Sequence, residues 1–215
     1  YIDQLIGTSS STVHGDVIDG GAGTDVLSMT SATANSQSTA ANTVSNVEEI
    51  TLSNALASGH LITTKNFQSG ISVVNLDVGS AAAGTIAFEA GSNTVDVKVA
   101  LGGTLTVSAA GTATTDSLTI NNVGSGITAL GNQSLDLNGI ETFTYNGSGT
   151  GSATTQTVDD IDLTGVSTGG TAKVIFTGSN AITFKSGSIV SANELDFSAV
   201  TGVVTMGAGS GRMEY

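Results

Sequence analysis

The sequence contains no cysteine, no proline and no tryptophan. Without cysteine, the chain forms no disulfides and offers neither thiolate metal ligands nor a cysteine nucleophile. The lack of proline favours uninterrupted hydrogen bonding between strands. No apolar run approaches the roughly 18 residues of a membrane-spanning helix, so we expect no membrane insertion. No cleavable signal peptide is visible, and because the chain begins at Tyr1 rather than at a methionine, we expect it to be a segment of a longer protein.

Basic residues are also scarce, because 5 Lys and Arg stand against 18 Asp and Glu and give a formal net charge of -13 at pH 7. Affinity for nucleic acid depends on Lys and Arg that neutralise phosphates, so nucleic acid is excluded as a partner. With 39% hydrophobic and 11% charged residues, the chain lacks the composition of a disordered protein. An acidic chain with few cations of its own either has a soluble acidic surface or binds divalent cations, and composition leaves both open.

Short runs rich in Val, Ile, Leu, Thr and Phe alternate with small polar residues through most of the chain. This period of two is typical of strands with one buried face. Clusters of Gly, Asn and Ser between the runs, such as Asn146–Gly149, are typical of turns. Sustained helical spacing is absent, and only residues 29–46 could form a short helix or a loop. The predicted strands are Val47–Leu52, Ile71–Val78, Gly84–Phe88, Thr94–Leu101, Thr104–Val107, Ser117–Ile120, Ile140–Tyr145, Asp160–Leu163, Ala172–Phe176, Ala181–Phe184, Glu194–Phe197 and Val203–Met206.

These runs indicate an all-β fold. Short strands joined by Gly-rich turns fit a β-solenoid-like stack, in which small and aliphatic side chains lie in layers. A β-sandwich is the alternative, because the same spacing suits hairpins. Several runs share a pattern in which a small or polar residue precedes an aliphatic residue, an acid and alternating apolar residues. The examples are Asn46–Leu52, Gly139–Tyr145, Asp159–Leu163 and, more loosely, Asn193–Phe197.

One segment carries metal-binding chemistry. Gly20–Ser28 reads Gly-Gly-Ala-Gly-Thr-Asp-Val-Leu-Ser and matches the calcium-binding nonapeptide Gly-Gly-x-Gly-x-Asp-x-aliphatic-x at every position. The glycines permit positive φ, so the backbone can curl and turn its carbonyl oxygens into one concavity. Asp25 adds a carboxylate to these oxygens. Calcium prefers six to eight hard oxygen ligands of this kind.

At this motif the sequence resembles the RTX-type surface-layer (S-layer) or surface-array proteins of Gram-negative bacteria. The similarity lies in Gly15–Leu27, in the Ser/Thr/Ala-rich stretch that leads to Asn46–Ile50, and in Asp3–Thr8, which is similar to the family's Asp-x-aliphatic-x-Gly-Thr element. Its specific part covers residues 3–52. The resemblance implies type I secretion, calcium-dependent folding outside the cell and self-assembly into a paracrystalline coat.

The chain departs from a regular array of such motifs. Asp16 and Ile18 keep the nine-residue register before the motif, but Ser11, Thr12 and His14 replace the glycines. In a regular β-roll the paired turns lie about 18 residues apart. Residues 2–7 and 38–43 lack the glycines and the full acid set, so a run of β-roll sites is excluded.

We therefore predict one or two irregular Ca2+ sites. The predicted ligands are Asp16, Asp19, Gly21, Gly23 and Asp25. The three acids lie within ten residues and would repel one another without a cation. The alternative is a glycine-rich turn with solvated aspartates and no ion. We expect an RTX-like motif in residues 1–30 and a strand-rich β domain in residues 31–215, or one continuous body.

Other candidate sites are weaker. His14 and His60 are the two histidines, and no Gly-x-Ser-x-Gly elbow lies between a strand and a helix. We expect both to be solvated surface residues and the protein not to be an enzyme. Asp159, Asp160 and Asp162 could provide a second calcium position, but without a glycine-rich turn an exposed acidic strand end is the better interpretation.

The sequence thus predicts a secreted, non-enzymatic, calcium-stabilised structural component of a bacterial surface layer. Its expected partners are copies of itself in a lattice and cell-surface polysaccharide. A calcium-rigidified repeat adhesin or biofilm-matrix binding module is the alternative. A third hypothesis places this segment beside the catalytic domain of a secreted hydrolase.

Overall fold

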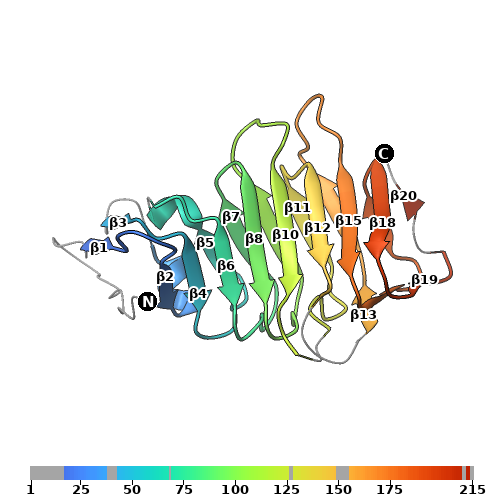
Figure 1. The fold of residues 1–215 in the computed structure, drawn as a ribbon, viewed down its shortest axis with the longest axis horizontal. Helices are drawn as coiled ribbons and strands as arrows, with labels where there is room; N and C mark the ends of the chain where they lie inside the picture. The colour runs from blue at the N-terminus through green and yellow to red at the C-terminus, as the bar shows by residue number, and fades with distance from the viewer. Residues whose placement is uncertain are drawn as a thin grey trace.

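The computed structural model describes residues 17–37, 43–67, 69–125, 128–148, 155–209 and 212–213. Short strands stack side by side along the long axis of the molecule, from the N-terminal end to the C-terminal end (Figure 1). Every strand pairing of the described residues is parallel. Parallel neighbours need a crossover between them and cannot be joined by hairpins. The predicted β-solenoid is confirmed, and the β-sandwich alternative is wrong.

Two large sheets form the walls of the solenoid. The first has eight strands, in spatial order β2 (Val26–Met29), β4 (Glu49–Leu52), β6 (Val73–Leu76), β8 (Ser92–Val97), β10 (Ser117–Asn122), β12 (Thr142–Asn146), β15 (Lys173–Gly178) and β18 (Glu194–Val200). The second has seven, in the order β5 (Leu61–Thr63), β7 (Gly84–Phe88), β9 (Leu105–Ala109), β11 (Leu135–Asn138), β14 (Ile161–Thr164), β17 (Ile189–Ser191) and β20 (Arg212–Met213). Each return of the chain to the eight-stranded sheet completes one coil.

The smaller elements lie near the two ends. A three-stranded sheet contains β13 (Thr155–Val158), β16 (Ala181–Phe184) and β19 (Val204–Met206), and a two-stranded sheet contains β1 (Val17–Asp19) and β3 (Thr43–Ser45). The helical elements are α1 (Ser31–Asn35) and the 3-10 helix η1 (Thr64–Phe67). The predicted short helix in residues 29–46 is therefore α1, which Thr30 caps by accepting the backbone N–H of Thr33 at 3.1 Å.

Inward-facing side chains form continuous columns between the walls. In the eight-stranded sheet the column runs through Leu27, Ile50, Val74, Val95, Ile120, Tyr145 and Phe176, all buried. In the seven-stranded sheet it runs through Ile62, Ile86, Val107, Leu137 and Leu163. Each such side chain stabilises the fold by about 1.5–3 kcal/mol on transfer from water. In-register stacking of like side chains is therefore what holds successive coils together.

Aromatic side chains are buried along the whole interior, with Phe67 and Phe88 in the early coils and Tyr145, Phe176 and Phe184 in the later ones. The rings of Phe176 and Phe184 meet edge to face with centroids 5.6 Å apart, a favoured aromatic geometry. Within the described part of the chain, no helix is long and apolar enough to cross a membrane.

Candidate metal site at the first coil

The Gly20–Asp25 turn connects β1 to β2 at the N-terminal end of the solenoid. Gly21 and Gly23 have φ of +87° and +123°, as the motif predicts. At Gly20, a side chain would overlap the backbone carbonyl oxygen of Asn46 and come within 2.7 Å of Asp25 Cβ. The turn therefore requires glycine for two reasons, which are positive φ at two positions and close backbone approach at the third.

Asp19 holds the start of this turn. Its Oδ1 accepts the Gly21 backbone N–H at 3.0 Å and the Asn46 side-chain amide at 2.7 Å. The bond from Asn46, followed by that from Gly21, lowers the pKa of the exposed Asp19 carboxyl. Asp19 thus already has a role in the turn as an acceptor of hydrogen bonds.

Asp25 lies at the end of the turn and contacts the next coil through its backbone. Its N–H donates to Glu48 Oε2 at 2.9 Å, and its carbonyl oxygen accepts the N–H groups of Glu48 and Glu49, both at 3.2 Å. Its side-chain Oδ2 is buried, and no described group donates a hydrogen bond to it. A buried carboxylate oxygen without a donor is costly unless a cation neutralises it.

The structure brings together some of the predicted metal ligands and does not describe all of them. Gly21, Gly23 and Asp25 form one turn with Asp19 at its start, whereas Asp16 lies outside the described residues. Among the residues described, no three His, Asp or Glu side chains converge as a metal cluster. The donors present thus fit a calcium ion only if backbone carbonyl oxygens supply most of the coordination, which calcium accepts.

Glu48 belongs to this site although the sequence pattern did not predict it. The bond from Asp25 spans 23 residues, so this coil is longer than the spacing of about 18 residues between paired turns of a regular β-roll. One signal was available, because Glu48 is the acid of the Asn46–Leu52 pattern. The hydrophobic pattern does not indicate how many residues one coil contains, so it could not predict that Glu48 lies beside Asp25.

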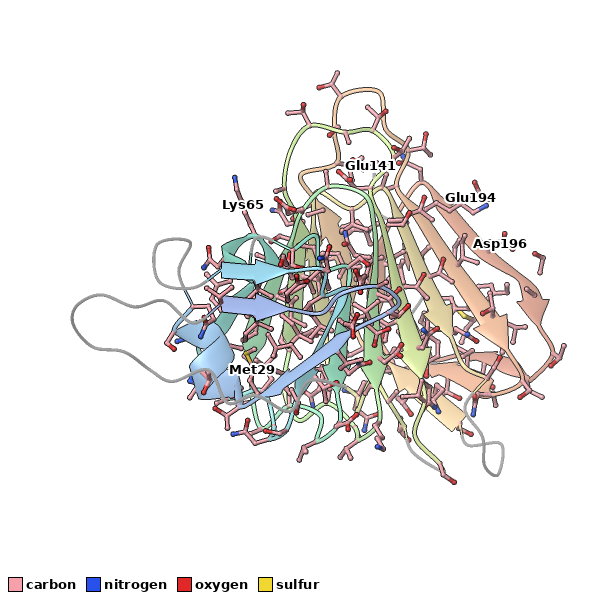
Figure 2. The ribbon with its side chains drawn as sticks, turned by 60° about the vertical axis from the view of Figure 1, so that its left-hand side comes forward. Met29, Lys65, Glu141, Glu194 and Asp196 are labelled. Carbon is pink, nitrogen blue, oxygen red and sulfur yellow. The ribbon has the colours of Figure 1, made fainter. Side chains whose placement is uncertain are left out.

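The same arrangement recurs without a glycine-rich turn. Asp116 donates its backbone N–H to Glu141 Oε2, and Glu141 Oε1 accepts the N–H of Ser167, both at 2.9 Å. The Asp116 carboxylate in turn accepts the N–H of Gly91. Glu141 lies inside the corner where the chain enters β12 (Figure 2). The acid of the repeated pattern therefore caps backbone N–H groups of a neighbouring coil.

The other sequence candidates have structural roles. His60 is half-buried rather than fully solvated, because its Nδ1 lies 3.1 Å from Oγ of Ser31. Ser31 is completely buried, so this Ser–His pair offers no nucleophile to a substrate. His14 lies outside the described residues. At the acidic strand end, Asp159 pairs with Lys185 at 2.7 Å, and Asp160 accepts the N–H of Ile189 at 2.8 Å.

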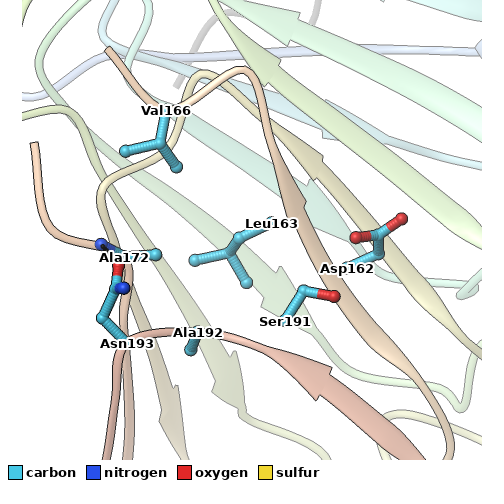
Figure 3. Close-up of a pocket in the computed structure, with 7 residues that line it drawn as sticks. All are labelled: Asp162, Leu163, Val166, Ala172, Ser191, Ala192 and Asn193. Atoms are coloured by element: carbon cyan, nitrogen blue, oxygen red, sulfur yellow. Dashed lines mark hydrogen bonds between the residues drawn. The ribbon is translucent and has the colours of Figure 1, made fainter. Parts of the chain in front are cut away.

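A shallow pocket of about 350 Å³ lies near the C-terminal end (Figure 3). Its lining residues are Asp162, Leu163, Val166, Ala172, Ser191, Ala192 and Asn193. Asp162 is the only acid among them, and no histidine lines the pocket. The pocket therefore contains neither a carboxylate pair nor a nucleophile with its base.

Comparison with protein-family models, with curated proteins and with solved structures finds no match to this chain.

Proposed function

We propose that this chain is a non-enzymatic structural component of a bacterial surface layer, a parallel β-solenoid that calcium stabilises at the Gly20–Asp25 turn. The observation that carries the proposal is the buried Oδ2 of Asp25, which no described group satisfies. Secretion to the cell surface and self-association into a coat are part of the same proposal.

The chemistry of the turn supports calcium. The motif supplies curled backbone through Gly21 and Gly23, and Asp25 supplies a carboxylate oxygen that lacks a donor. Glu48 brings a second carboxylate from the next coil within hydrogen-bond distance of the Asp25 backbone. With a net charge of -13, the chain has few cations of its own to neutralise this pair. An ion here would link the first and second coils.

Thermal unfolding with and without a calcium chelator tests the calcium role. A ligand at 100 times its Kd stabilises the native state by about 2.7 kcal/mol. For a chain of this size, that free energy raises Tm by about 5–10 °C. An unchanged Tm would remove calcium from the proposal. Negative-stain imaging of the protein in calcium tests the coat, since an ordered array is expected and dispersed particles would contradict it.

The adhesin alternative is favoured by the outward face of the eight-stranded sheet, which no described element covers (Figure 1). This face carries aligned columns of small polar side chains, namely Ser92, Ser117 and Thr142, and beside them Thr94, Thr119 and Thr144. The next column is fixed by hydrogen bonds, because Asn121 donates to Asp96 at 2.8 Å and Asn146 donates to Asn121 at 3.2 Å. An adhesin would bind glycan or host protein through such a face and form no array in calcium.

A further inference from the structure

One edge of the solenoid carries a row of exposed valines in the middle of the molecule. Strands β6, β8 and β10 end at this edge, and Val78, Val99 and Val123 follow them within two residues, in three successive coils (Figure 1). Each of these valines is 44% exposed. Most large hydrophobic side chains of the described residues are buried, so three exposed ones along a single edge mark it as a candidate contact surface.

Backbone contacts hold the first two valines side by side. Lys98 donates its N–H to the Leu76 carbonyl oxygen at 3.2 Å, so the turn after β8 lies in register beside the turn after β6. This register places Val99 beside Val78. A Cβ at Gly79 would come within 2.5 Å of the Val99 carbonyl oxygen, so the two turns are closely packed. The valines therefore form a continuous apolar row rather than isolated exposed side chains.

A pair of opposite charges flanks this row. Lys98 Nζ lies 3.5 Å from Asp77 Oδ2, and the two side chains are 59% and 42% exposed. An exposed pair of this kind contributes little to the stability of one molecule. An ammonium group has three N–H donors and a carboxylate accepts several bonds, so both groups can also bond a second molecule. Because copies with a net charge of -13 repel one another, a contact that contains a lysine is favoured over one that contains only acids.

We propose that two copies of this chain meet along this edge about a twofold axis, with their long axes antiparallel. The axis passes between the turns that follow β6 and β8, so Val78 of each copy faces Val99 of the other and Lys98 faces Asp77. Parallel copies would instead place Lys98 against Lys98 and Asp77 against Asp77, which like-charge repulsion disfavours. A twofold contact is self-complementary and closed, so the coat would grow through other surfaces as well. The inference rests on the proposed coat and names one of its contact surfaces.

Charge reversal followed by mixing tests this contact. In calcium, the wild type is expected to form ordered arrays that sediment and are visible by negative stain. Lys98→Glu and Asp77→Lys should each stay dispersed, because each variant brings like charges together across the axis. An equal mixture of the two variants should form arrays again, since the introduced carboxylate then faces the introduced ammonium group. The pair within each molecule stays broken in the mixture, so recovery requires a contact between molecules.

Lys65→Glu is the matched control for net charge, because Lys65 is exposed on η1 and its reversal changes the charge by the same amount. This variant should form arrays as the wild type does. All variants should remain folded by circular dichroism and keep the calcium-induced increase in Tm. Arrays from either single variant of the pair, equal loss in Lys65→Glu, or a dispersed mixture would overturn the contact and leave the coat standing. A dispersed wild type would overturn the coat and the contact with it.

Discussion

Asp116 donates its backbone N–H to Glu141 across one coil, and both side chains are only 2% exposed. The bond spans 25 residues and joins the corner before β10 to the corner before β12. Asp25 and Glu48 form the same bond at the start of the solenoid. The difference lies in the aspartate that donates, because the Asp116 carboxylate accepts the N–H of Gly91, whereas Asp25 Oδ2 has no donor among the described residues. Backbone N–H groups therefore bond to the carboxylates of Asp116 and Glu141, whereas at Asp25 the proposed calcium ion would take that role.

Glu141→Ala is expected to destabilise the protein by about 2–4 kcal/mol, because the buried N–H groups of Asp116 and Ser167 lose their acceptor. Glu141→Gln should lose less stability, because its remaining carbonyl oxygen still accepts one of the two bonds. Its amide NH2 group would then face the other N–H donor. The shift of the urea midpoint measures both effects. Glu194→Gln is the control, because the Glu194 side chain is 53% exposed and its change should be small. Equal midpoints for Glu141→Ala and the control would contradict the capping role.

The calcium response is expected to depend on Asp25 and Glu48 together. Asp25→Asn removes the charge of the orphaned carboxylate, and Glu48→Gln weakens the second one, so each variant should lose most of the Tm increase that calcium gives the wild type. Differential scanning calorimetry at fixed calcium, with chelator as the reference, measures this increase.

Asp162→Asn is the matched control for these variants. Asp162 is exposed on β14, where the register places it beside Asp136, far from the Gly20–Asp25 turn along the axis (Figure 1). Its calcium response should equal that of the wild type. If Asp162→Asn lost the calcium-induced increase in Tm and Asp25→Asn kept it, the binding site would instead lie on the outer face of the seven-stranded sheet.

Gly20→Ala is expected to open the first coil, because the added methyl group would overlap a carbonyl oxygen of the backbone, which cannot rotate away as a side chain can. Gly21→Ala is the comparison, since its Cβ would meet no atom within 4 Å and its φ of +87° alone would cost about 1–3 kcal/mol. Hydrogen exchange of residues 17–29 measures the opening, because coils of a repeat fold can separate locally. Greater loss of protection in Gly21→Ala than in Gly20→Ala would contradict the close approach.

Much of the fold is predictable because one face of each strand is buried. In Thr142–Asn146 the buried Phe143 and Tyr145 alternate with partly exposed residues, so the period of two is evident from sequence. Strands whose inward positions are few or polar are not evident from the sequence. In β13, for example, the inward Gln156 is buried and accepts hydrogen bonds from Tyr145 and Ala129, which no alternation of apolar residues reveals.

The candidate site was predictable only within its own turn. Positive φ at Gly21 and Gly23 followed from the local motif, because glycine spacing encodes local backbone shape. The contribution of Glu48 depends on how many residues one coil contains, and that number is set by loops whose length the strand pattern does not specify. Site residues on neighbouring coils, such as Asp25 and Glu48, can therefore be paired only from the three-dimensional structure.

Alkaline unfolding is expected to be coupled to Tyr145. The phenol is completely buried and donates to Gln156 Oε1 at 2.7 Å, and burial raises its pKa far above the value of an exposed tyrosine. Because the folded pKa lies above the unfolded value of about 10, the stability linked to the neutral phenol is fully present below pH 10 and falls as pH rises above it.

Tyr145→Phe should lower the free energy of unfolding by about 1 kcal/mol at neutral pH, because the hydrogen bond to Gln156 is lost. Between about pH 10 and pH 12, the stability of this variant should then fall less than that of the wild type. Urea midpoints at both ends of this range measure the difference, and phenolate absorbance should show one tyrosine of the wild type ionising only as the protein unfolds. Parallel pH dependence of the two proteins would show that Tyr145 ionises without unfolding, and the buried phenol could not then be the group that limits stability at high pH.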